Sequence, residues 1–146
     1  MLEDDRYEAL VKKLDMILES LSGFQREALR PGAVPLVIVE SPFSNLNQLF
    51  HENNIAYARA AVRDSINRGE APIAFHLLYP QDGILDDKDP VDRARGLTVS
   101  QCWYTVASKV VVYEDMGYSQ GMVMGLQWAG YLGLPVEFRK IEGWKP

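Results

Sequence analysis

The apolar residues near the amino terminus recur at the spacing of an amphipathic helix. Asp4 or Asp5 can serve as its N-cap, and the pattern continues to about Ser22. Gly23 then provides a stop, and residues 24–33 form a connector that contains proline and glycine. The apolar positions, spaced by three and four, are Tyr7, Leu10, Leu14, Ile17 and Leu21.

Short, nearly continuous apolar runs follow, separated by longer segments with helical periodicity. Such runs are typical of parallel strands that are covered on both faces. The predicted strands are residues 34–40, 71–79, 109–114 and 135–141. The predicted helices are residues 51–68, with the buried stripe Ile55, Ala58, Val62 and Ile66, residues 91–107, and residues 119–132.

Turn residues mark the boundaries of these helices. Asp89 is a natural N-cap for the second of them, and Pro90 suits its first turn. Gly69 and Gly133 end the first and the third. Strands that alternate with helices predict right-handed crossovers between parallel strands.

We therefore expect a Rossmann-like, three-layer α/β sandwich with a mostly parallel sheet of four to five strands and an added N-terminal helix. The predicted division is residues 1–33 for the helix and connector and residues 34–146 for the α/β domain. The leucine stripe of the added helix is expected to cover either the edge of the sheet or a neighbouring subunit, and we favour the contact in a homo-oligomer.

Composition narrows the classes of partner. The chain of 146 residues has a net charge of −5 and a sequence pI near 5.0, which gives no attraction to a nucleic acid polymer or to an anionic membrane surface. Cys102 is the single cysteine, the amino terminus is acidic, and no apolar run is long enough for a membrane span. We expect a cytoplasmic protein.

Polar residues gather where the predicted strands end, which is where ligands bind in open α/β sheets. Ser119 and Gly121 open a helix whose free N–H groups suit a phosphate, although Ser119 also fits a simple N-cap. His76 lies within a predicted strand, where a hydrogen-bonded core residue is the commoner role. No zinc spacing or calcium loop is present, so we expect neither a metal nor a cofactor. The candidate ligand-binding residues are Ser41, Pro42, His76, Asp86, Asp87, Asp115, Ser119, Gly121 and Met122.

Several of these segments together resemble a known family. The chain is similar to a phage and bacterial family of uncharacterised proteins that resembles the nucleoside 2-deoxyribosyltransferases and the nucleotide N-glycosidases. The resemblance covers about residues 34–141. The segments that carry it are Ser41-Pro42-Phe43, residues 54–61, His76-Leu77-Leu78-Tyr79, Leu85-Asp86-Asp87 through Pro90, and residues 115–122.

The resemblance implies a pocket for a nucleoside- or nucleotide-like ligand. In it, Ser119, Gly121 and Met122 would contact a phosphate, while Ser41, Pro42 and His76 would line the base or sugar side. Asp115 would hold ribose hydroxyls, and Asp86 and Asp87 would close over the site. In the enzymes, a glutamate six positions after the serine attacks the anomeric carbon. Here that position is Gly125.

The missing glutamate leaves two main hypotheses. In the first, the protein binds a nucleotide-like ligand without turnover, for example to sequester a nucleotide signal in a phage setting. In the second, it is an N-glycosidase or transferase in which Asp115, Glu114 or an aspartate of the acidic loop, residues 81–90, takes the missing role. A structural or interaction protein that uses its helix stripe for assembly is a third interpretation.

Overall fold

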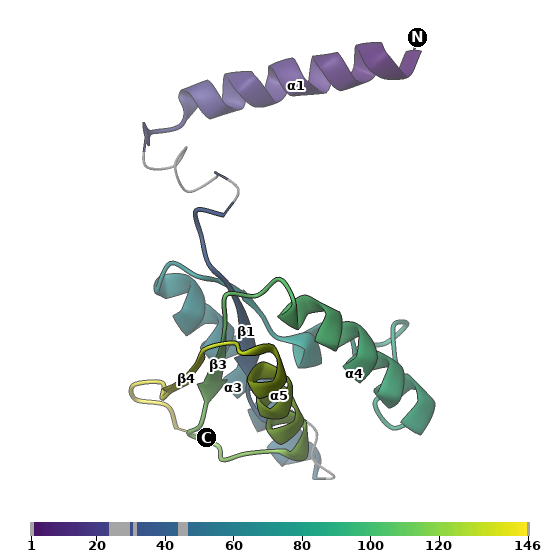
Figure 1. Ribbon diagram of the computed structural model, residues 1–146, viewed down its shortest axis with the longest axis vertical. Coiled ribbons are helices and arrows are strands. Elements are labelled where there is room, and N and C mark those ends of the chain that lie inside the picture. Colours follow the sequence, from purple (N-terminus) through teal and green to yellow (C-terminus); the bar gives the residue numbers. More distant parts are fainter. Residues whose placement is uncertain (1, 24–29, 31, 44–46, 146) are drawn as a thin grey trace. The chain divides into compact units, whose positions relative to one another are not determined.

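A computed structural model describes residues 2–23, 30, 32–43 and 47–145 (Figure 1). The chain divides into two compact units, Met1–Val34 and Pro35–Pro146. Most of the predicted connector, residues 24–29 and 31, lies outside the described residues.

The first unit contains the predicted helix, α1, Leu2–Ser20. The helix begins before Asp4 and Asp5, so neither is its N-cap, and that prediction is wrong. The stripe side chains Tyr7, Leu10, Leu14 and Ile17 are all more than half exposed. An exposed apolar stripe on a helix of five turns is typical of a surface that pairs with another helix.

We expect the helix stripe to hold a homo-oligomer together. The double variant Leu10→Asp/Leu14→Asp places two carboxylates on the stripe and should reduce the mass of the full chain in solution to the 16.5 kDa of a monomer. Multi-angle light scattering measures this mass. The variant Lys12→Asp/Met16→Asp has the same spacing on the opposite face and should leave the mass unchanged. A monomeric wild-type protein would contradict the expectation.

The second unit is built on a sheet of four strands, all parallel, in the order β2-β1-β3-β4. The strands are β1 (Leu36–Glu40), β2 (Ala71–Ile73), β3 (Lys109–Tyr113) and β4 (Val136–Arg139). The predicted fold class is confirmed. The chain leaves β1 towards β2 and leaves β3 towards β4, so the switch in strand order lies between β1 and β3.

Helices cover both faces of this sheet, as Figure 1 shows with α3 behind it and α5 in front. They are α3 (Gln48–Asn67), α4 (Pro90–Tyr104) and α5 (Gln120–Leu132). Val37 and Val39 pack with residues of α3, whereas Ile38 packs with residues of α4 and α5. Because side chains alternate along a strand, Glu40 points to the same face as Ile38.

Two details of the predicted elements are wrong. The strand expected at residues 71–79 ends at Ile73, and Phe75–Leu77 form a 3₁₀ turn, η1. The Phe75 carbonyl accepts hydrogen bonds from the N–H groups of Leu78 and Tyr79, so the backbone bonds locally instead of to β1. His76 consequently lies on a turn beyond the strand.

The buried stripe of α3 also differs from the expected one. Ile66 is about half exposed, and the buried positions are Asn54, Tyr57, Ala58, Ala61 and Ser65. Polar side chains lie inside because each has a partner; Tyr57 donates to Asp115 and Ser65 to Glu70. A pattern of apolar residues alone therefore places the stripe one position away.

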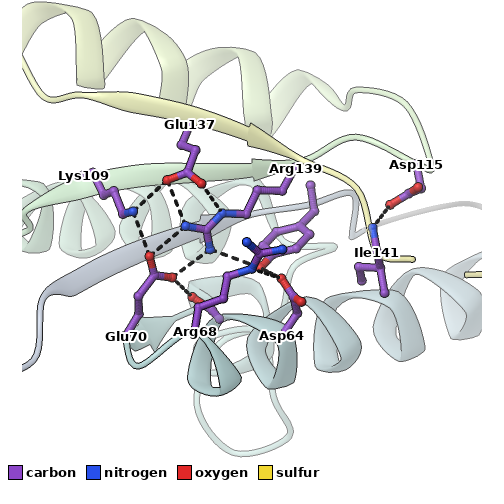
Figure 2. Close-up of polar contacts among 10 residues, drawn as sticks. Asp64, Arg68, Glu70, Lys109, Asp115, Glu137, Arg139 and Ile141 are labelled. Atoms are coloured by element: carbon purple, nitrogen blue, oxygen red, sulfur yellow. Dashed lines mark hydrogen bonds and ion pairs between the residues drawn. The ribbon is translucent and has the colours of Figure 1, made fainter. Parts of the chain in front are cut away.

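A buried ion-pair network, centred on Arg139, joins β4 to the start of β2 on the α3 side of the sheet (Figure 2). Arg139 donates to both carboxylate oxygens of Glu70 at 2.7 Å. It also donates to Glu137, and Lys109 bridges Glu70 and Glu137 at 2.8 and 2.7 Å. Mainly through the hydrogen bonds of Arg139, the pKa of Glu70 and that of Glu137 fall to about 2.

Candidate functional site

A cavity of about 330 Å³ opens beyond the carboxyl ends of the strands, on the side of α4 and α5. Segments that follow β1 and β2 line it together with the first turns of α5, so it adjoins the point where strand order switches. Its volume is at the lower end of the range for small-molecule sites. Aromatic and polar side chains share the lining, and the aromatic ones are Phe43, Phe75, Tyr79, Tyr104 and Trp128.

The structure brings together most of the residues proposed from the sequence. Six of the nine candidates line the cavity: Ser41, His76, Asp87, Ser119, Gly121 and Met122.

Ser41 and His76 form a hydrogen-bonded pair in the wall of the cavity. Ser41 Oγ and His76 Nε2 are 2.8 Å apart, and Ser41 is 3% exposed. The ring of Phe43 packs against the imidazole at a centroid distance of 5.7 Å. Burial lowers the pKa of His76 to about 4, so the imidazole is neutral near pH 7. The uncharged pair therefore offers hydrogen bonds, but no charge, to a ligand.

Ser119 is the N-cap of α5, as the simpler interpretation of the sequence expects. Its hydroxyl accepts a hydrogen bond from the Met122 N–H at 3.3 Å. Ser119 and Gly121 both line the cavity. The first turn of α5, at the positive end of the helix dipole, therefore borders the cavity.

Three candidates lie outside the cavity lining. Pro42 is buried beside Ser41. Asp86 is exposed, and its carboxylate accepts a hydrogen bond from the Lys88 N–H within its own loop. Asp115 accepts from the Tyr57 hydroxyl at 2.6 Å and from the Ile141 N–H at 2.9 Å, and so joins α3 to the segment after β4 (Figure 2).

The acidic loop reaches the cavity through one ion pair. Arg93 Nη1 donates to Asp87 Oδ1 at 2.8 Å, and both side chains line the cavity. Asp89 caps α4 by accepting from the Val91 N–H, which confirms its predicted role. The loop thus presents a paired charge to the cavity, and its other aspartates act within the loop or at the helix start.

Gly125 leaves space that a carboxyl group from another element fills. The Glu40 side chain extends from the end of β1 to the backbone of α5 at Gly125. A Cβ atom at position 125 would overlap Glu40 Oε1 and would come within 2.7 Å of the Tyr104 hydroxyl oxygen. The Tyr104 hydroxyl donates a hydrogen bond to Glu40 Oε1.

The environment of Glu40 disfavours its charge. Burial raises its pKa from 4.5 to about 7, and the hydrogen bond from Tyr104 only partly offsets this rise. A carboxyl group with such a pKa, in a cavity, is suited to hold or release a proton near neutral pH. Sequence reasoning missed Glu40; the available signal was a carboxylate at the last position of an apolar strand, two residues after Ile38.

A sequence comparison assigns the chain to a family. Residues 35–139, which include all four strands, match the family described as a domain of unknown function (DUF7768). The chain belongs to this family. No curated protein matches the sequence.

The DUF7768 domain has a fold that is known from an enzyme structure. It resembles the structure of a 2-deoxyribosyltransferase from the psychrotolerant bacterium Bacillus psychrosaccharolyticus, with a TM-score of 0.51 and 20% sequence identity. The similarity covers 76% of this chain and 76% of that one. At this identity the likeness concerns the fold.

Among the described residues of the chain, no group of three or more His, Cys, Asp or Glu side chains is placed to hold a metal ion. Within the same part of the structure, no helix is both long and apolar enough to span a bilayer.

Proposed function

We propose that the cavity binds a nucleoside- or nucleotide-like small molecule. The observation that carries this proposal is the cavity itself, because it combines an aromatic wall with the N-terminal turn of α5. Aromatic rings pack against a flat nucleobase, and a helix N-terminus favours an anion. The fold shared with a deoxyribosyltransferase, described as a biocatalyst for the synthesis of nucleosides, supports the same class of ligand.

The lining suggests how such a ligand would be oriented. A 5′ phosphate would lie at Ser119 and Gly121, at the N-terminal turn of α5. The sugar and base would lie towards Ser41 and His76, whose neutral hydrogen-bonding groups suit hydroxyls and ring nitrogens. A cytoplasmic location, expected from the sequence, would give the cavity access to the cellular nucleotide pool.

The phosphate assignment makes a specific prediction for Ser119→Ala. This variant should bind nucleoside 5′-monophosphates about tenfold more weakly, because one hydrogen bond to a charged group is lost, while the matching nucleosides should keep their affinity within about twofold. Isothermal titration calorimetry on each pair of ligands measures the difference.

Ser119→Thr is the matched control for this prediction. It keeps a hydroxyl that can cap α5 and should retain the affinity for monophosphates. Equal losses for nucleosides and monophosphates in Ser119→Ala would remove the phosphate assignment. If the wild-type protein bound no nucleoside or nucleotide at millimolar concentration, the proposed function would be wrong.

A second candidate function, hydrolysis of the N-glycosidic bond of the ligand, is favoured by one observation. Glu40 places a carboxyl group in the cavity although Gly125 cannot supply one. Asp115 and Glu114, which the sequence offered for this role, are not among the lining residues; Glu114 accepts a hydrogen bond from the Tyr118 hydroxyl instead.

A further inference from the structure

One oxygen of the Glu40 carboxyl group is fixed and the other is open to the cavity. Oε1 accepts the hydrogen bond of Tyr104. Oε2 has no hydrogen-bond partner among the described residues. In that part of the chain every buried side-chain polar atom does have a partner, so Oε2 is not a buried atom. Oε2 is therefore reached from the cavity, which Glu40 lines. The group is oriented by one contact and free to act through the other.

The residues around the Glu40 carboxyl group leave space for it and place no cation beside it on α5. Helix α5 carries no charged side chain, so no cation neutralises Glu40 from this direction. Gly125 provides the space, since a larger residue there would displace both Oε1 and the Tyr104 hydroxyl. A carboxyl group held without a cation, in contact with a ligand cavity, differs from the ion-paired carboxylates Glu70 and Glu137 elsewhere in the fold.

From this geometry we infer that Glu40 is a catalytic residue, whose Oε2 delivers a proton to the nucleobase and so breaks the N-glycosidic bond of a nucleoside or nucleotide. The inference rests on the proposed nucleoside-like ligand. Tyr104 is a positioning residue, because it acts through Oε1 and keeps the carboxyl group directed at the cavity.

The reaction consumes one water molecule. The proton on Oε2 passes to the nucleobase nitrogen while the bond between that nitrogen and the anomeric carbon breaks, and the bonding electron pair leaves with the base. The oxygen of water then bonds to the anomeric carbon, and one water proton returns to Oε2. The products are the free base and the sugar or sugar phosphate, and Glu40 regains its proton.

Among the charged and titratable groups around Glu40, Glu40 is the one expected to change its protonation state near neutral pH. The pKa of Glu40 is about 7, and that of His76, in the same cavity, is about 4. Asp87 is paired with Arg93, and Asp92 accepts hydrogen bonds from Arg95 and from the backbone of the acidic loop. Because the protonated form of Glu40 is the active one, the rate should fall as the pH rises through about 7.

The test uses the full chain and a panel of ribonucleosides, deoxyribonucleosides and their 5′-monophosphates. Chromatography measures the release of free nucleobase, and calorimetry measures binding. Glu40→Gln keeps the shape and the Tyr104 contact, so binding should stay within about threefold while base release falls by about 100-fold or more. Glu142→Gln makes the same chemical change at an exposed position and should keep full activity.

The pH profile gives a second, independent readout. Tyr104→Phe removes the hydrogen bond that favours the carboxylate, so the pKa of Glu40 should rise and the decline of the rate should move to higher pH. A purely structural role for Tyr104 would not move this decline. The profile also tests the inference if Glu40→Gln does not fold.

Two results would overturn the inference without affecting the proposed function. In the first, the wild-type protein binds members of the panel and releases no base. In the second, base is released and Glu40→Gln releases it at the wild-type rate. If the wild-type protein binds nothing on the panel, the proposed function fails, and the inference fails with it.

Discussion

Arg139→Met is expected to lower the free energy of unfolding by about 3–5 kcal/mol, the usual cost of removing one partner of a buried ion pair. Arg139 is 6% exposed and Glu70 is 8% exposed, and the two share a bidentate contact. Without the guanidinium, Glu70 keeps its desolvation cost and loses two of its hydrogen bonds. Urea denaturation at pH 7 measures the change.

A second substitution and a change of pH separate this mechanism from a simple loss of packing. In Arg139→Met, Lys109 is the cation that still contacts Glu70; Arg139→Met/Glu70→Gln removes this poorly compensated carboxylate and should recover at least about 1 kcal/mol. The stability that comes from Glu70 and Glu137 is present above their ordinary pKa of 4.5 and is lost as the pH falls towards about 2. The gap between wild type and Arg139→Met should therefore narrow towards pH 2. A gap that stays constant with pH would contradict the ion-pair explanation.

Glu40→Gln should become more stable than the wild type as the pH rises. The pKa of Glu40 is about 7 in the folded protein and near 4.5 in the unfolded chain, so the folded state holds an extra proton between these values. At about 1.4 kcal/mol per unit, the wild type loses up to about 3 kcal/mol from this group between pH 4 and pH 8, and the glutamine variant does not. Denaturation curves at both pH values measure the difference.

The control for this second stability prediction is again Glu142→Gln. That residue is exposed, so its substitution should leave the difference between pH 4 and pH 8 at the wild-type value. If Glu40→Gln followed the wild-type pH dependence, Glu40 would be ionised without penalty in the folded state. The proton-donor role would then lose its physical basis.

The sequence correctly predicted the elements that local sequence patterns specify. The apolar runs at Leu36–Glu40 and Lys109–Tyr113 are central strands, and Gly133, with a φ of 67°, ends α5 as expected. Predictions failed where tertiary contacts decide the local structure or which side chains are buried. Strand β2, at the edge of the sheet, gives way to a local turn at Phe75, and α3 buries hydrogen-bonded polar residues that an apolar pattern cannot detect.

The candidate site was predictable in part, because parallel strands end at one rim of the sheet. That rule found Ser41, His76 and the Ser119 turn. It also selected Asp115, whose carboxylate bonds to Tyr57 and Ile141. Glu40 was missed because its role depends on an empty position on α5, far along the chain, and no local pattern connects the two.

The contact between Glu40 and Gly125 has a consequence for how the family can diverge. A Cβ at position 125 would overlap Glu40 Oε1, so any side chain there requires the Glu40 carboxyl group to leave its present place. Replacement of the glycine therefore favours a shorter residue at position 40. Relatives with a larger residue at position 125 should carry a shorter one at position 40, so the pair should covary.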